Sequence, residues 1–440
     1  MVAERAVRCG VLQVPENRIE QTGRTIPIRV AVLPAALPSA RRADPVVYFA
    51  GGPGGSAITS LPSEVQELAL LHARHDFIFV DQRGTGSSNP LRCRAFPSLG
   101  DAKVLRRAVS TCLASLHADL AYYTTAMAID DVADVLRALH IARADLVGGS
   151  YGATAAQVFL LRHPALVRTM TLIGGTLLPL PIYERMPSAA QSALAAVFGR
   201  CTHERACQRA FPHLAADWAR LQAWAATSPR VVLRAPGTAA ASMRFDTATL
   251  ADAVHQVLIS ASTAARLPLL VHLIASAKDP AAEVAKVASA LASEPSAPSS
   301  MITYPIRCGE PWAADRPSQL SGTTSFEYGS DQESARWWRA VCALMPRPPE
   351  GTIYGALGRS DVPVLMFNGS ADPQDPPANM TGARRYWPES RLLVMPGQSH
   401  RLDLPTWHAM RRIAPGALRQ PRGCDPPRRK LPAAPRAAAL

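Results

Sequence analysis

A serine between glycines is the strongest chemical signal in this chain of 440 residues. The segment Gly148-Gly149-Ser150-Tyr151-Gly152 follows the short apolar run 145–147 and precedes a helical pattern over residues 153–161. At a sharp turn from strand to helix, small neighbours avoid clashes, and the serine hydroxyl stands clear of the sheet at the positive end of the helix. This context predicts that Ser150 is the nucleophile of an acyl-transfer reaction.

A serine hydroxyl is a weak nucleophile at neutral pH, so a histidine must take its proton and an acid must orient that histidine. His400 and Asp372 each come just after a strand-like run, as Ser150 does. Asp375 is a second candidate for the acid, but Asp372 lies nearer to the strand end and Asp375 lies among prolines. The sequence therefore predicts a catalytic triad of Ser150, Asp372 and His400.

A glycine-rich loop offers donors for the oxyanion of such a reaction. Residues 51–55, Gly-Gly-Pro-Gly-Gly, directly follow another strand-like run. Backbone without side chains can approach a ligand closely, so the N–H of Gly52 can join the N–H of Tyr151 in an oxyanion hole. Losing one such donor typically costs about 2.7 to 4 kcal/mol of transition-state stabilisation. The same two donors would serve an amide or an ester carbonyl.

Short apolar runs and helical patterns alternate along the chain and must position these groups. The runs are rich in β-branched and aromatic residues, which is typical of buried parallel strands: 46–50, 77–80, 146–147, 169–173, 362–367 and 391–395. Apolar residues at helical spacing over 129–139 lead into the strand before Ser150. Strands that alternate with helices predict an α/β fold with a mostly parallel sheet flanked by helices.

The middle of the chain differs from its two ends. Residues 178–361 lack strand-like runs of comparable strength and are dominated by alanine-rich helical patterns. We therefore expect a core in two parts, 1–177 and 362–418, with 178–361 as a mainly helical lid over the strand ends where ligands bind in such sheets. Residues 419–440 form a basic, proline-rich tail.

Composition excludes several classes of protein. Hydrophobic residues make up 48% of the chain, and charged residues make up 18%, against a typical value of about 25%. The chain is therefore globular, and it has no run of roughly 18 apolar residues, so we expect no integral membrane association. The net charge is +13, but the 47 Lys and Arg residues are scattered, which argues against a nucleic-acid partner. No motif implies a metal or a cofactor, and the oligomeric state is left open.

The eight cysteines predict disulfide bonds, which form in exported proteins. We expect four pairs, the first two because they are close in sequence and the last by elimination: Cys201 with Cys207, Cys93 with Cys112, Cys308 with Cys342, and Cys9 with Cys424. The start, Met1-Val-Ala-Glu-Arg5, lacks the apolar stretch of a signal peptide. A secreted or periplasmic location is expected from the cysteines, and a cytoplasmic one stays open.

Several motifs occur together in an order that resembles one family. They are Gly-Gly-Pro-Gly-Gly-Ser at 51–56, Asp-Gln-Arg-Gly-Thr-Gly-Ser at 81–87, Gly-Gly-Ser-Tyr-Gly at 148–152, Gly-Ser-Ala-Asp-Pro at 369–373 and Pro-Gly-Gln-Ser-His at 396–400. Together with the segments around the cysteines, they resemble the α/β-hydrolase family of prolyl and tripeptidyl aminopeptidases over nearly the whole chain. The resemblance implies a Ser-Asp-His hydrolase that removes residues from free peptide N-termini, with esterases among its relatives. Asp81 and Arg83 are expected to brace a loop rather than to do chemistry.

The chain departs from the family pattern at three positions. Ala50 stands where the prolyl enzymes usually have His, Ser399 stands before His400 where glycine is common, and Asp375 stands where threonine is frequent. None of these changes removes a catalytic group, but they leave the substrate open.

The leading hypothesis is a serine hydrolase that cleaves amide bonds at peptide N-termini. A carboxylesterase for small lipophilic esters is the alternative, because the lid is rich in alanine and leucine, and a binding protein without activity is disfavoured because all three catalytic groups are present. An aminopeptidase needs a carboxylate for the substrate's ammonium group. Glu310 is the first candidate, ahead of Glu184 and Glu204.

Overall fold

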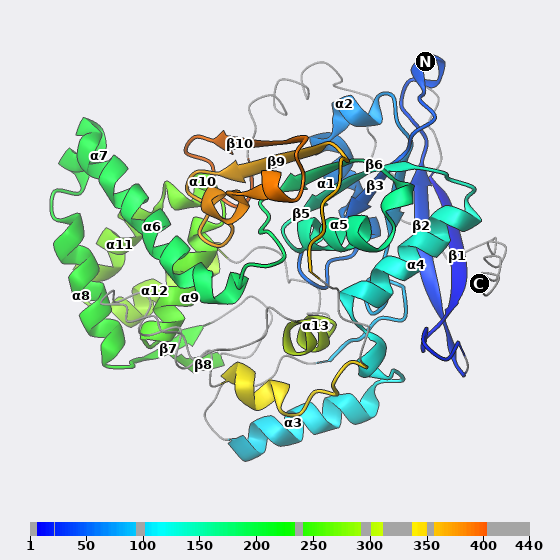
Figure 1. Cartoon of the computed structure of the whole chain (residues 1–440). Coiled ribbons are helices and arrows are strands. Elements are labelled where there is room, and N and C mark those ends of the chain that lie inside the picture. The colour runs from blue at the N-terminus through cyan, green and yellow to red at the C-terminus, as the bar shows by residue number, and fades with distance from the viewer. Residues whose placement is uncertain are drawn as a thin grey trace.

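The computed structural model describes part of the chain, and that part contains a sheet of eight strands (Figure 1). That part is residues 7–402 without residue 22 and without 94–101, 234–240, 292–300, 311–336 and 350–355. The strand order is β1-β2-β4-β3-β5-β6-β9-β10. The strands are β1 (Arg8–Pro15), β2 (Thr25–Leu33), β3 (Val46–Phe49), β4 (Phe77–Val80), β5 (Ala144–Gly149), β6 (Val167–Ile173), β9 (Val364–Gly369) and β10 (Ser390–Met395).

The central strands are buried along their whole length. Every residue of β3 and β4 is buried, which explains why their sequences are continuous apolar runs. From β4 to β10 all neighbouring strands are parallel, whereas β1 and β2 are antiparallel at one edge. The predicted α/β fold with a mostly parallel sheet is therefore confirmed, and all six predicted strands are present. The antiparallel strands β1 and β2 were not predicted.

The chain between β3 and β6 also contains helices, most of which lie along the sheet in Figure 1. They are α1 (Ala57–Glu67), α2 (Ala69–His72), α3 (Ala102–Ser115), α4 (Thr125–Ala138) and α5 (Tyr151–Arg162). The α5 helix is buried from Tyr151 to Leu160. The α4 helix is capped at its start by Thr124, whose side chain accepts a hydrogen bond from the N–H of Met127. Apolar side chains of α3, α4 and α5 pack with the sheet in one large core, and those of α1 pack with β3 and β4 in a second cluster.

The chain between β6 and β9 forms a second group of helices, green in Figure 1, to one side of the sheet. They are α6 (Ile182–His203), α7 (Arg205–Ala210), α8 (Leu214–Ala226), α9 (Thr247–Leu258), α10 (Ala261–Ala264), α11 (Leu267–Ser276) and α12 (Pro280–Leu291). A small antiparallel hairpin, β7 (Arg230–Leu233) with β8 (Ala241–Arg244), accompanies them and was not predicted. These elements bury their own hydrophobic cluster. We propose that α6 to α12 are the lid, and we call them the lid helices.

The later part of the segment expected to be lid packs differently. Helix α13 (Thr303–Gly309) and the helical residues 337–342 contribute Ile306 and Val341 to the core of the sheet domain, not to the cluster of the lid helices. In Figure 1 both lie beside α3. The stretch 178–361 thus contains two parts with different packing partners.

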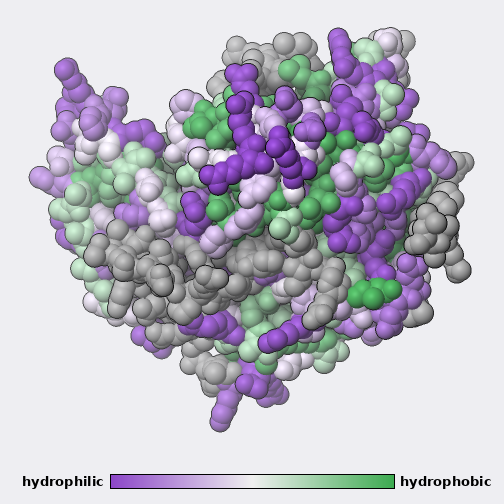
Figure 2. All heavy atoms as spheres, in the orientation of Figure 1, coloured by the Kyte–Doolittle hydropathy of each residue, from purple (hydrophilic) through white to green (hydrophobic). Residues whose placement is uncertain are grey.

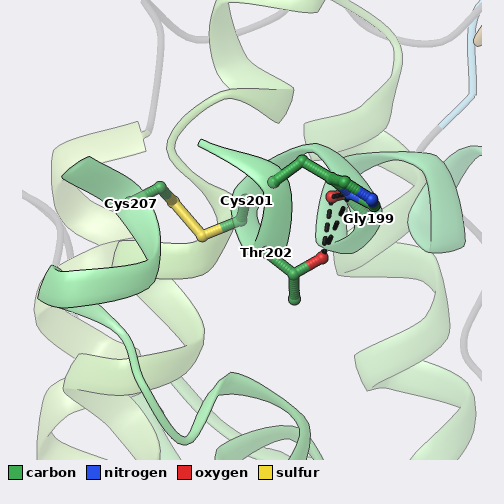
Figure 3. The surroundings of a disulfide bond; sticks show 5 residues. Gly199, Cys201, Thr202 and Cys207 are labelled. Atoms are coloured by element: carbon green, nitrogen blue, oxygen red, sulfur yellow. Dashed lines mark hydrogen bonds between the residues drawn. A yellow bond between two sulfur atoms is a disulfide. The ribbon is translucent and has the colours of Figure 1, made fainter. Parts of the chain in front are cut away.

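Three of the four expected disulfide bonds are present. They join Cys93 to Cys112, Cys201 to Cys207 and Cys308 to Cys342. Figure 3 shows the second of them, which ties α7 to the last turn of α6. Cys424 lies outside the described residues, so the pair of Cys9 with Cys424 stays a prediction. Such bonds typically contribute roughly 2 to 4 kcal/mol each.

Over the coloured part of the surface in Figure 2, hydrophilic side chains are widespread and hydrophobic ones lie between them. Among the described residues, no helix combines the length and the apolar character needed to cross a bilayer.

Two charged residues brace the loop after β4, as the sequence predicts. Asp81 accepts hydrogen bonds from Ser56 Oγ (2.7 Å) and from the N–H groups of Ile58 and Ser87 (3.1 Å each), so it holds the start of α1 against the loop. Arg83 and Asp131, both fully buried, form a two-pronged ion pair at 2.7 and 2.8 Å. Arg83 thereby fastens the loop to α4.

The buried ion pair gives a test of this bracing. Arg83→Met leaves Asp131 buried with Arg18 as its ion-pair partner and removes the donor to the carbonyls of Glu16 and Tyr122, so the free energy of unfolding should fall by about 3 to 5 kcal/mol in urea titrations. The matched control is Arg92→Met, at an exposed arginine of the same loop, which should change stability by no more than about 0.5 kcal/mol. Equal effects of the two substitutions would contradict the bracing role.

Candidate active site

The residues singled out in the sequence follow the carboxyl ends of parallel strands, on one side of the sheet. Ser150 follows β5, the glycine-rich loop follows β3, Asp372 comes after β9 and His400 comes after β10. These strands are parallel, and with β6 they stand in the order β3-β5-β6-β9-β10. Because the carboxyl ends of parallel strands meet at the same edge, the fold brings these segments together.

Ser150 occupies a strained turn between β5 and α5. Its backbone has φ 55° and ψ −127°, a conformation that few residues other than glycine adopt. A Cβ on Gly148 would lie 2.1 Å from the carbonyl oxygen of Gly152, and a Cβ on Gly152 would lie 2.0 Å from that of Phe49. Glycine is therefore required at both positions, because α5 packs with its backbone directly on the strands. The Ser150 side chain remains partly exposed at the start of the helix.

The glycine-rich loop lies against this turn. A Cβ on Gly51 would be 3.3 Å from Ser150 Cβ and 3.9 Å from Ser150 Oγ. The next residue, Gly52, has φ 132°, and Tyr151 is the first residue of α5. Thr303 of α13 donates a hydrogen bond to the carbonyl of Pro53 (2.7 Å), which ties the loop to that helix. The structure thus brings Gly52 and Tyr151 to the neighbourhood of Ser150.

His400 and Asp372 form a hydrogen-bonded pair, with 3.0 Å between Nδ1 and Oδ2. The other oxygen of Asp372 accepts from two backbone N–H groups, those of Gln374 (2.9 Å) and Asp375 (2.8 Å). Asp372 is therefore fixed on both sides. The imidazole lies against Gly174, where a Cβ would be 3.2 Å from His400 Nδ1.

Gly174 follows Ile173, the last residue of β6, and thereby links the histidine to the serine. The carbonyl of Ile173 accepts the N–H of Ser150 (2.9 Å). Ser150 and His400 thus lie on either side of the same strand end.

Asp375 places a second carboxylate beside the same imidazole. Its Oδ2 lies 3.5 Å from His400 Nδ1, and its Oδ1 accepts from the hydroxyl of Thr176 (2.5 Å). Burial raises the pKa of Asp375 to about 6, which His400 opposes and the charge of Asp372 reinforces. Burial by itself would lower the pKa of His400, but Asp372 and then Asp375 outweigh it, so that this pKa lies above its usual value. The shorter distance and the backbone bonds favour Asp372 as the orienting acid.

Gln374 and His255 also belong to this cluster, although nothing in the sequence pointed to them. The Gln374 amide nitrogen lies 3.0 Å from His400 Nε2 and 3.2 Å from Asp375 Oδ2. Its oxygen lies 3.4 Å from Nε2 of His255, a residue of lid helix α9. Gln374 lies between Asp372 and Asp375 in the sequence, and this position is the one sequence signal that points to a role for Gln374 in the site. His255 lies in an ordinary helical pattern.

Glu310, at the end of α13, is buried with 3% exposure. Its two carboxylate oxygens accept from the N–H (2.7 Å) and the hydroxyl (3.0 Å) of Thr125. That hydroxyl also pairs with the phenol oxygen of Tyr151 at 2.8 Å. Glu310 is thus two hydrogen bonds from the residue that follows Ser150. Of the other candidates, Glu204 is exposed, and the side chain of Glu184 lies outside the described part.

Two groups of described residues bring carboxylate and imidazole ligand atoms within 4.8 Å of one another, the spacing of a metal site. The first is Asp372, Asp375 and His400, whose polar atoms are joined by the hydrogen bonds given above. The second is Asp44, His75 and Asp145, which lie at the amino ends of β3, β4 and β5. There Arg168 forms ion pairs with both carboxylates. An arginine already supplies the positive charge at that second group.

Comparison with known proteins identifies the family. The family model of the alpha/beta hydrolase fold matches residues 44–402, and the chain belongs to this family of hydrolases. Tripeptidyl aminopeptidases of Streptomyces lividans and Streptomyces coelicolor are each 25% identical over 189 residues, covering 38% of this chain and 35% of theirs. The match thus spans about a third of the length of these relatives.

Similar solved structures include an iminopeptidase and an esterase. One is a proline iminopeptidase of Mycobacterium smegmatis, 16% identical, with TM-score 0.41 and coverage of 92% of this chain and 96% of the other. Another is an esterase of Thermogutta terrifontis, 15% identical, with TM-score 0.40 and coverage of 92% and 95%.

The two aspartates can be separated by their effects on pH dependence. A general base must be neutral, so kcat/KM should rise with pH through the pKa of His400, which lies above the usual value of about 6.5. Asp375→Asn removes a negative charge beside the ring, so it should lower this pKa and shift the acid limb of the profile to lower pH.

The matched variant is Asp372→Asn, which should reduce kcat by about 10⁴-fold because the imidazole loses its orienting acid. If Asp375→Asn caused the larger loss of kcat and Asp372→Asn only shifted the profile, the two roles would be reversed.

Proposed function

We propose that this hydrolase acts through an acyl-enzyme formed on Ser150. His400 takes the proton of the Ser150 hydroxyl, the serine oxygen attacks the substrate carbonyl, and His400 returns the proton to the leaving amine or alcohol. Water, deprotonated by the same imidazole, then releases the acid product. The observation that carries this proposal is the placement of the strained Ser150 turn and the His400–Asp372 pair on either side of one strand end.

The N–H groups of Gly52 and Tyr151 are proposed as the oxyanion hole. Tyr151 opens α5, so its N–H lies at the positive end of a helix. Gly52 belongs to the loop that lies against Ser150, and this loop is held by Thr303 and by the Asp81 contacts. Such bracing keeps the donors oriented before the charge develops, which is the main requirement for electrostatic stabilisation.

Gln374 must move during the reaction. A neutral imidazole whose Nδ1–H is given to Asp372 has one acceptor, Nε2, and the Gln374 amide occupies it at 3.0 Å. The Ser150 hydroxyl needs the same acceptor for proton transfer. The amide therefore gives way to the serine when the substrate binds.

For the substrate, we propose peptides with a free N-terminus. The tripeptidyl aminopeptidase relatives support this class, and Glu310 is a buried carboxylate bonded to Thr125, whose hydroxyl pairs with Tyr151. A buried negative charge at that place would attract a substrate ammonium group.

A carboxylesterase is the second candidate, and one observation favours it. Both oxygens of Glu310 already accept hydrogen bonds from Thr125. If these bonds are the whole role of Glu310, it positions α4 and Tyr151, and the site needs no ammonium group in the substrate.

We also propose that the protein works outside the cytoplasm. Three disulfide bonds in the described part of the chain support this, because such bonds persist in oxidising compartments.

The first test replaces the nucleophile. Ser150→Ala should fold normally and lose hydrolysis by about 10⁶-fold in kcat, because the members of a triad act as a unit. Far-UV circular dichroism serves as the control for folding. Phosphonate labelling followed by mass spectrometry should find the label on Ser150 in the wild type, and a label on another serine would contradict the assignment.

The second test addresses the substrate class. The wild-type enzyme is assayed on peptidyl amides with free and with blocked N-termini, and on short acyl esters. Glu310→Gln keeps the shape of the side chain and removes its charge. Loss of one partner of a buried charge pair costs roughly 2 to 5 kcal/mol, so kcat/KM for free-amine peptides should fall about thirtyfold or more while ester hydrolysis changes little.

Equal wild-type activity on free and blocked peptides would contradict the aminopeptidase proposal. A uniform loss on all substrates in Glu310→Gln would assign Glu310 to the positioning of Thr125 and Tyr151.

A further inference from the structure

The carboxyl end of lid helix α9 is bonded to both chain neighbours of His400. The hydroxyl of Ser399 donates to the carbonyl of Leu258, and the N–H of Arg401 donates to the carbonyl of Ile259 at 2.9 Å. Ser260 and Arg401 also form a parallel bridge. The histidine thus lies between two residues that the lid holds.

These contacts use groups that a helix end leaves without partners inside the helix. The last carbonyls of an α-helix have no intrahelical donor, and here the His400 loop supplies two. Ser399 is 1% exposed and Leu258 is 1% exposed, so their bond is shielded from water. The bond therefore fixes the helix end and the loop to each other.

A second connection runs from the same helix to the imidazole. His255 of α9 pairs with the Gln374 oxygen at 3.4 Å, and the Gln374 nitrogen reaches His400 Nε2 and Asp375 Oδ2. One assignment of protons satisfies all of these contacts: His255 donates from Nε2, the amide donates to His400 and Asp375, and His400 donates from Nδ1 to Asp372. Burial lowers the pKa of His255, which keeps it in the neutral form that this assignment requires.

We propose that helix α9 positions His400 for catalysis, with Ser399 holding the loop that carries the imidazole. The inference rests on the proposed function, since it takes His400 as the general base. Ser399 is a positioning residue, because it acts through the loop that carries His400. The bond from Gln374 to Nε2 belongs to the enzyme before the substrate binds, so it is not part of this positioning.

The test removes the Ser399 hydroxyl, and the control removes the hydroxyl of Thr263, a residue of α10 that also donates to the carboxyl end of α9. Thr263 Oγ1 donates to the carbonyls of Val257 (2.6 Å) and Ser260 (3.0 Å). Ser399→Ala should lower kcat by about 10- to 100-fold with KM changed little, because small misplacement of a catalytic group has effects of this size. Thr263→Ala should leave both constants close to wild type.

A readout besides activity is the ring N–H proton of His400, which resonates far downfield in proton NMR when it is bonded to a carboxylate. Ser399→Ala should broaden or shift it and should lower the apparent pKa of the acid limb. The charged and titratable groups that face this ring are Asp372, Asp375, His255 and Arg401, and the substitution changes none of them. A shift would therefore report a displaced ring.

Ser399→Gly provides a second variant, which removes the same hydroxyl and keeps the proposal testable if Ser399→Ala fails to fold. It should also lower kcat and change KM little. Wild-type kcat, pH profile and N–H resonance in both variants would overturn the positioning role while Ser150→Ala remained inactive. Full activity of Ser150→Ala would instead overturn the proposed function itself.

Discussion

The close packing of α5 on the sheet is the constraint on which the site depends. Gly148 and Gly152 have no room for a Cβ, because the helix backbone lies directly on β3 and on its own preceding strand. That approach goes with a turn in which Ser150 has φ 55° and ψ −127° and stands at the start of α5. The loops after β3, β6, β9 and β10 all start at the carboxyl ends of parallel strands. They therefore lie on the same side of the sheet as Ser150. Hydrogen bonds hold these loops in place. Asp81 and Thr303 bond to the glycine-rich loop and its end at Ser56, and Asp372 bonds to the imidazole of His400.

Much of this arrangement was predictable because its signals are local. Continuous apolar runs predicted the six parallel strands, and the helical patterns between them predicted a parallel sheet. Ser150, Asp372 and His400 each follow such a run, and because the strands are parallel their carboxyl ends meet on one side of the sheet. The antiparallel strands β1 and β2 gave a weaker signal, since one of their faces is partly exposed and their burial alternates. Hydrophobic periodicity identified the lid helices, but it did not assign α13 to the core of the sheet domain.

The contacts that refine the site could not be predicted from sequence patterns, because they join residues far apart in the chain. Glu310 and Thr125 are separated by 185 positions, and Ser399 and Leu258 by 141. Gln374 and His255 are ordinary polar residues whose importance comes from the neighbours that folding gives them. A carboxylate such as Asp375 acquires a pKa of about 6 only after burial next to another acid, which no local pattern encodes.

The attachment of α9 to the His400 loop has a consequence for how such enzymes can diversify. An insertion joined to its host domain only at its two ends could be exchanged between relatives as a cassette, with new specificity and unchanged chemistry. Here a third attachment exists in the middle of the insertion, at Leu258 to Ser260. A chimaera that replaced the lid helices without this segment would lose two hydrogen-bond partners of the histidine loop. Recombination and design on this scaffold are therefore constrained to keep the end of α9 together with the residues on either side of His400.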